Sequence, residues 1–100
     1  MNFERLNEDK AVRLRIAGEL DAITAPELRS AFDALAAEEP SRVVLDLSAL
    51  DLIDSSGVGA IVSLFKQLKT FGGELGVVGL QGQPRSIFRL LRLDRVFGVE

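Results

Sequence analysis

The residues whose types and spacing are best suited to chemistry lie together in residues 54–59, which read DSSGVG. Serine is a good N-cap, so we expect a helix to begin at Ser55 or Ser56. The free amides of a first helical turn lie at the positive end of the helix dipole and attract anions. The stretch therefore predicts an anion site, filled either by a ligand or by a phosphoryl group on the serine itself.

Two other interpretations of this stretch compete with the first. Asp-Ser-Ser before an apolar helix commonly serves as a cap and nothing more. Gly57 and Gly59 also resemble the start of a dinucleotide-binding turn, but Val62 occupies the position of the third glycine and no Walker-type lysine follows. Nucleotide binding is therefore disfavoured, whereas simple capping stays open as an alternative.

Composition excludes several classes of function. The chain has 100 residues with no Cys and no His, so a Ser-His-Asp triad, a cysteine nucleophile and a thiolate zinc site are impossible. A net charge of -3, and six Phe without any Tyr or Trp, disfavour a nucleic-acid surface. No carboxylates, lysines or serines are spaced to converge, so we expect no enzymatic activity, no cofactor and no metal.

The sequence also indicates where the protein acts. Residues 1–10 contain no apolar segment of the secretory kind. No apolar run approaches the about 20 residues that a membrane-spanning helix needs. We therefore expect a cytoplasmic protein that does not bind membranes.

Strands and helices must position residues 54–59, and the first of them form an N-terminal hairpin. Apolar residues alternate from Val12 to Ile16, a period of two that predicts a half-buried strand closed by residues 18–21. Residues 3–6 are the expected partner strand, joined through the polar residues 7–10.

A first helix is expected next. Thr24 and Glu27 have the spacing of a capping box, and Pro26 is tolerated in a first turn. An apolar stripe follows at i, i+4 and i+7, and Pro40 limits the helix at its end. The stripe consists of Leu28, Phe32 and Leu35.

The second half of the chain continues this alternation. Residues 43–47 fit a central strand covered on both faces, and the helix after residue 54 ends at Gly72 and Gly73. Residues 75–80 predict a strand whose glycines indicate close packing or a bulge. The helix carries an apolar face of Val58, Ile61, Val62, Phe65 and Leu68, with Lys66 and Lys69 on its other side.

A third helix is expected from residues 83–84, and residues 95–99 are expected to form a short edge strand. The order ββαβαβα(β) predicts one α/β domain over residues 1–100. Its mixed sheet has four to five strands, with right-handed crossovers between the parallel pairs. Core packing is favoured over a place in a contact surface for Ile53, Val58, Leu90, Leu91 and Leu93.

Three blocks of this sequence resemble the STAS domain family, and within it the anti-sigma-factor antagonists. Residues 54–59 look like the family signature Asp-Ser-(Ser/Thr)-Gly-aliphatic-Gly. Residues 18–21, GELD, with Thr24 and Ala25 opening a helix, are similar to a second block, and residues 72–75, GGEL, to a third. The spacing of all three fits, and the resemblance covers nearly the whole chain.

The resemblance implies a partner-switching mechanism. The unphosphorylated antagonist binds an anti-sigma factor that is also an ATP-dependent serine kinase, and a sigma factor is thereby released. The kinase then phosphorylates the antagonist, the complex dissociates, and a serine phosphatase restores it. The family's phosphorylated serine directly follows the aspartate, which places it at Ser55, with Ser56 as the second choice.

By the same resemblance, five residues are expected in partner binding or kinase recognition. Asp21 could help the kinase orient Ser55, and it could equally serve only to end a turn. For Thr24, capping of the helix is favoured over contact with a partner. Gly57 would allow close approach of backbone or partner. The five are Asp21, Thr24, Asp54, Ser56 and Gly57.

One departure and one alternative accompany the resemblance. Family members often continue past the last strand into a further helix, whereas this sequence ends at Glu100, which puts a partner surface built on that helix in doubt. We expect a monomer when the protein is free. The alternative function is a STAS subunit that serves as a non-switching scaffold in a stressosome-like or lipid-transport ATPase complex.

Overall fold

A five-stranded mixed sheet forms the framework of the protein. The computed structural model describes residues 1–8 and 11–99. The strands lie in the order β1-β2-β3-β4-β5, with β1 antiparallel to β2 and all later neighbours parallel. The α/β class, the mixed sheet and the order ββαβαβα(β) are confirmed. The strands are β1 (Asn2–Glu8), β2 (Ala11–Leu20), β3 (Arg42–Ile53), β4 (Glu74–Val78) and β5 (Gly98–Val99).

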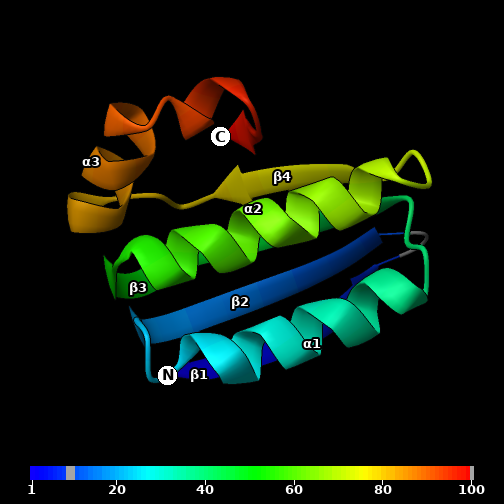
Figure 1. Ribbon diagram of the computed structural model, residues 1–100, viewed down its shortest axis with the longest axis horizontal. Helices are drawn as coiled ribbons and strands as arrows, with labels where there is room; N and C mark the ends of the chain where they lie inside the picture. Colours follow the sequence, from blue (N-terminus) through cyan, green and yellow to red (C-terminus); the bar gives the residue numbers. More distant parts are fainter. Residues whose placement is uncertain (9–10, 100) are drawn as a thin grey trace.

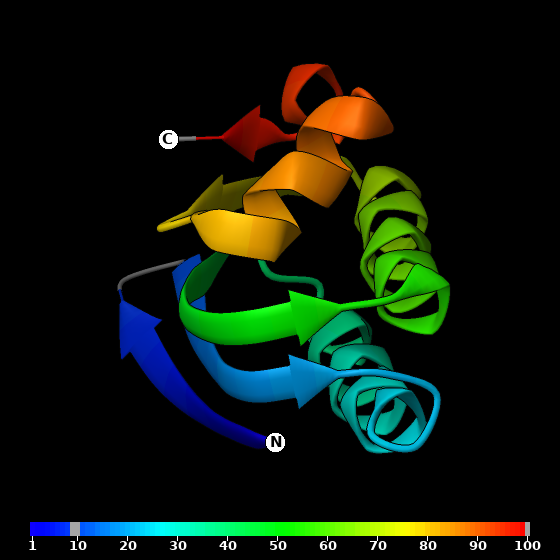
Figure 2. The same cartoon turned by 90° about the vertical axis from the view of Figure 1, so that its left-hand side faces the viewer.

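Two of the three helices cover one face of this sheet. Helices α1 (Ala25–Ala37) and α2 (Ser55–Lys69) lie side by side over β2, β3 and β4 (Figure 1). Helix α3 (Gly82–Leu90) lies apart from this pair, beyond the end of β4 and against the last part of β3, and a short 3-10 turn, η1 (Leu93–Arg95), leads on to β5 (Figure 2). These two helices connect successive parallel strands in the same direction along the sheet, and crossovers of one hand then place both on the same face.

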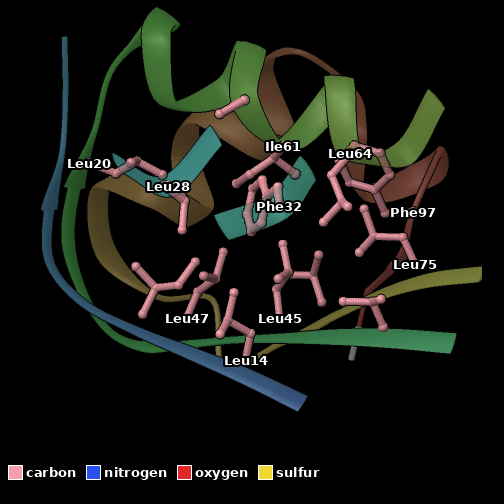
Figure 3. Close-up of a cluster of buried hydrophobic side chains, with 14 of the residues drawn as sticks. Leu14, Leu20, Leu28, Phe32, Leu45, Leu47, Ile61, Leu64, Leu75 and Phe97 are labelled. Atoms are coloured by element: carbon pink, nitrogen blue, oxygen red, sulfur yellow. The ribbon is translucent and has the colours of Figure 1, made fainter. Parts of the chain in front are cut away.

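The core fills the space between that face and the two helices (Figure 3). Alternate residues of the strands meet the apolar stripes of the helices, and Phe32 and Phe88 are among the largest side chains with almost no exposure. A fully buried Leu or Phe side chain contributes about 1.5–3 kcal/mol. The core members labelled in Figure 3 are Leu14, Leu20, Leu28, Phe32, Leu45, Leu47, Ile61, Leu64, Leu75 and Phe97.

The N-terminal hairpin is longer than the sequence predicted. Strand β1 pairs with β2 along its whole length, from Asn2 opposite Ala17 to Glu8 opposite Ala11. The prediction of a partner strand was right, but its bounds of 3–6 were too narrow. Residues 9–10 of the predicted connection lie outside the described residues.

The central strand differs most from its prediction. Residues 43–47 were expected as a strand with a link after them, whereas β3 runs on to Ile53. Two register shifts against β2, between Arg15 and Ala17 and between Gly18 and Glu19, insert extra residues into β3. Such bulges break the alternation of buried and exposed side chains. The buried residues after Leu47 are Leu50 and Ile53, three apart.

Helix α2 turns a different face to the core than the one predicted. Ile61 and Leu68 are buried as expected, but Val58, Val62 and Phe65 are only half-buried. The fully buried face consists of Gly57, Ala60, Ile61, Leu64 and Leu68. Two small residues at the start of the face let the helix approach the sheet closely.

The C-terminal segment corrects two further predictions. Leu90 and Leu91, expected in the core, are 76% and 51% exposed. Helix α3 ends at Leu90 and buries only Pro84 and Phe88, so the two leucines fall beyond its contact with β3. Leu93 is half-buried. The strand expected over residues 95–99 is limited to Gly98–Val99, because η1 occupies the segment before it.

Candidate functional site

The predicted site lies where the carboxyl ends of two neighbouring parallel strands meet. Leu20 and Ile53, the last residues of β2 and β3, are register partners. The Asp54 amide donates to the Leu20 carbonyl at 3.1 Å, so the loops after the two strands are tied together. Strand β2 leads through the loop of residues 21–24 into α1, and β3 leads through Asp54 into α2 (Figure 2). The fold therefore brings residues 21–24 and residues 54–57 to one edge of the sheet.

Asp54, rather than a serine, caps helix α2. Its backbone is extended, and its carboxylate accepts from the amides of Ser56 at 2.9 Å and of Gly57 at 3.1 Å. Aspartate in this position satisfies two of the donors that a helix start leaves free. The predicted start at Ser55 is confirmed, but the serine N-cap is wrong. The carboxylate of Asp54 takes two of the first-turn amides that the predicted anion site would use, so a bound anion would have fewer donors there.

The two serines lie in the first turn of α2 and differ in accessibility. Ser55 is exposed, whereas Ser56 is half-buried. Neither hydroxyl makes a side-chain hydrogen bond to another described residue. The capping bonds of α2 are made by Asp54 instead. The sequence placed both serines in the same half-turn without separating them. Burial is the property that distinguishes them.

Gly57 lets the start of α2 rest directly on the strand ends. The residue is buried, and a Cβ added to it would lie 2.6 Å from Leu20 Cγ, 2.8 Å from Ile53 Cγ1 and 2.9 Å from the Leu20 carbonyl oxygen. Real Cβ atoms do not come this close to other atoms, and a backbone oxygen gives way little. The close approach expected at Gly57 is therefore to this protein's own backbone.

The loop between β2 and α1 is closed by Asp21 and Thr24. The Asp21 carboxylate accepts from the amides of Ile23 and Thr24, both at 3.0 Å. The Thr24 hydroxyl accepts from the Asp21 amide at 3.0 Å and donates to the Glu19 carbonyl at 3.0 Å. These bonds make Asp21 a turn-forming residue.

The capping box predicted from Thr24 and Glu27 is wrong. Thr24 is the N-cap residue of α1, but its side chain makes no capping bond. Its backbone is already helical in conformation, so its hydroxyl is directed back to the preceding turn. Pro26 in the first turn has no amide to offer.

The hydrogen bonds of this loop also affect the acidity of Asp21. The pKa of its carboxyl is held below the ordinary value of 3.8, chiefly by the Thr24 backbone amide, although partial desolvation opposes this. Asp21 is therefore charged at neutral pH. Together with Asp54 it makes this edge of the sheet acidic.

Two glutamines that sequence reasoning missed support the same edge. The Gln83 amide pairs with the backbone of Ile53, accepting from its N–H at 2.9 Å and donating to its carbonyl at 2.8 Å. Gln81 donates to the Ser48 carbonyl at 2.7 Å. Strand β4 pairs with β3 only as far as Asp46, so the glutamines bond to the part of β3 that β4 leaves unpaired. No local sequence signal marks such long-range partners.

Asp54 and Ser55 are both exposed at the start of α2. Two hollows in the described surface lie elsewhere: one is between the C-terminal ends of α1 and α2, near Gln67, and the other is beside Phe65 and Val96. None of the site residues lines either hollow. Within residues 1–8 and 11–99, no group of three or more acidic side chains is arranged to hold a metal ion.

None of the helices in the described part of the chain is long and apolar enough to cross a membrane.

Comparison with known proteins gives consistent matches. The model of the STAS domain family matches residues 3–100. The anti-sigma-B factor antagonist of Listeria monocytogenes is 31% identical over 85 residues, which cover 85% of this chain and 75% of that protein.

Solved structures agree with that match. The crystal structure of an anti-sigma factor antagonist from Mycobacterium paratuberculosis is 30% identical and superposes with a TM-score of 0.86, covering 98% of this chain and 85% of that one. The phosphorylated form of the Bacillus cell fate determinant SpoIIAA is 20% identical with a TM-score of 0.78, covering 99% and 91% of the two chains. At that identity the likeness shows a common fold.

Proposed function

Because the chain belongs to the STAS domain family, we propose that it is an anti-sigma factor antagonist whose binding is switched off by phosphorylation of Ser55. Its partners in this proposal are a cytoplasmic anti-sigma factor with serine kinase activity and a serine phosphatase. The proposal is supported by relatives that carry the antagonist name. One observation carries the choice of residue: Ser55 is an exposed serine directly after the capping Asp54, with no side-chain bond to another described residue.

Accessibility favours Ser55 over Ser56 as the phosphorylated residue. A kinase must bring the hydroxyl to the terminal phosphoryl group of ATP, and Ser55 is exposed whereas Ser56 is half-buried. The free hydroxyl of Ser55 does not have to break a capping bond first. Phosphorylation there would leave the cap from Asp54 to Ser56 and Gly57 in place.

Charge explains how a modification that keeps the fold would end binding. A phosphoryl group adds about -1.5 to -2 charges at neutral pH. Asp54 already occupies two of the first-turn amides, those of Ser56 and Gly57, and Asp21 holds a second negative charge at the same strand ends. The new charge therefore gains little from this protein, and burying it in an interface is costly unless the partner supplies basic groups.

The remaining site residues act in this proposal by shaping the surface around Ser55. Asp54 fixes the start of α2, and Gly57 sets the helix against the strand ends. Asp21 and Thr24 form the neighbouring loop. Ser56 lies beside the phosphorylated serine, where it would contact the kinase.

The test is to incubate the protein with ATP and the purified anti-sigma factor kinase of its own organism. Mass spectrometry of the tryptic peptide 43–66, with fragmentation to locate the group, should place one phosphoryl group on Ser55. Ser55→Ala should abolish the modification, and the matched control Ser56→Ala should keep it. Ser55→Asp should bind the kinase at least about tenfold more weakly, a change of about 1.4 kcal/mol.

Two results would count against the proposal. Binding by Ser55→Asp as tight as by the wild type would refute release by charge. Absence of any modification while the partner still binds would favour the non-switching scaffold subunit, and the serines would then be plain first-turn residues.

A further inference from the structure

Ile23 is the most exposed of the large apolar side chains in the described part of the chain, at 88%. It lies in the loop between β2 and α1, two residues after Asp21. Single exposed apolar residues are common on protein surfaces and need no explanation by themselves. Ile23 differs because of the rigidity of its loop and the place where that loop lies.

The loop holds Ile23 in a fixed position. The Ile23 amide donates to the Asp21 carboxylate at 3.0 Å. The next residue, Thr24, is held by its amide to the same carboxylate and by its hydroxyl to the Glu19 carbonyl. The backbone is therefore ordered before any partner arrives, and a preordered group loses less conformational entropy on binding.

The loop lies beside the serine that we propose to be phosphorylated. The last residue before the loop, Leu20, accepts from the Asp54 amide at 3.1 Å, and Ser55 follows Asp54 directly. A partner that covers Ser55 therefore also reaches this loop. Glu19, Asp21 and Asp54 belong to the same strand ends as this loop.

We propose that Ile23 is the apolar contact through which the anti-sigma factor is held beside Ser55. The partner would supply an apolar pocket for this side chain. A few side chains in well-packed pockets near the centre of an interface carry most of its binding energy, whereas the rim carries little. The inference rests on the proposed function, since it names the residue by which that partner is held.

This contact also gives a reason for Asp21 and Thr24 to matter in binding. Both are half-buried and use their polar atoms within the loop. They act as positioning residues that hold Ile23 and not as direct contacts. Replacing either should weaken binding through the loop.

The test measures binding of the purified anti-sigma factor kinase of the same organism, by calorimetry with a non-hydrolysable ATP analogue so that no phosphorylation occurs. Ile23→Ala should raise the dissociation constant by about 10- to 50-fold, because it removes three carbons that the proposed complex would bury. Leu90→Ala is the matched control: Leu90 is 76% exposed and lies on α3. The thermal midpoint of both variants should match that of the wild type, because neither side chain is in the core.

The outcomes separate this inference from the proposed function. If the wild type binds and Ile23→Ala binds equally well, the inference fails and the proposed function stands. If Leu90→Ala weakens binding as much as Ile23→Ala, a specific role of Ile23 is likewise overturned. If the wild type does not bind the kinase at all, the proposed function fails and this inference fails with it.

Discussion

Replacing Gly57 by alanine should destabilise the protein, although alanine is the better helix former. The added Cβ would lie 2.6 Å from Leu20 Cγ and 2.9 Å from the Leu20 carbonyl oxygen. A side chain can move aside, but the carbonyl belongs to the strand end that accepts the Asp54 amide. The start of α2 must therefore shift away from the sheet.

The size of this effect follows from two opposing contributions. Overpacking of this kind costs typically about 1–3 kcal/mol. Alanine recovers up to about 1 kcal/mol of helix propensity. With the full gain in helix propensity the net loss is up to about 2 kcal/mol. Each kcal/mol lowers the thermal midpoint of a domain of this size by about 4–8 °C.

Gly59→Ala is a control in the same helix. A Cβ there would meet only the Nη2 atom of Arg29, at 3.0 Å, the far end of a flexible side chain. This variant should be as stable as the wild type or slightly more stable. Because both substitutions gain similar helix propensity, the difference between their urea midpoints isolates the steric cost at Gly57. Equal midpoints for the two variants would refute the claim that Gly57 is required for close packing.

Two other predictions test the neighbouring loop and the glutamine contact. The carboxyl of Asp21 has a folded pKa below 3.8, so its contribution to stability is fully present above that value and is lost as pH falls through the lower folded pKa. Asp21→Asn should remove this pH dependence, so the stability difference between the wild type and the variant, measured by urea unfolding, should be larger at pH 7 than at pH 3. An equal difference at the two pH values would contradict the prediction. Gln83→Ala should expose the Ile53 amide to hydrogen exchange and slow phosphorylation through a raised KM with little change in kcat. Gln81→Ala, which frees only the Ser48 carbonyl, should leave the hydrogen exchange of the Ile53 amide unchanged. Equal effects of Gln81→Ala and Gln83→Ala would argue against a specific role of the bonds between Gln83 and Ile53.

The sequence by itself determined the features that depend on near neighbours. Alternation from Val12 to Ile16 and the stripe of Leu28, Phe32 and Leu35 predicted strand and helix correctly, because a period of two or of 3.6 is a local property. The order of these elements was enough to give the α/β class and the mixed sheet. The start of α2 at Ser55 was likewise predicted from local residue types.

Only the tertiary structure decided which groups face one another. Asp54 outcompetes the serines for the free amides of α2, and the Thr24 hydroxyl turns to the Glu19 carbonyl, because both choices depend on how the chain enters the helix. Strand β3 continues beyond the point where its alternation of buried and exposed residues ends, because bulges against β2 keep the two strands paired. Leu90 is exposed because α3 contacts the rest of the protein through Phe88. Burial and hydrogen bonding between distant segments are properties of the packed chain. A local pattern therefore cannot separate an apolar residue of the core, such as Leu20, from one exposed on the surface, such as Ile23.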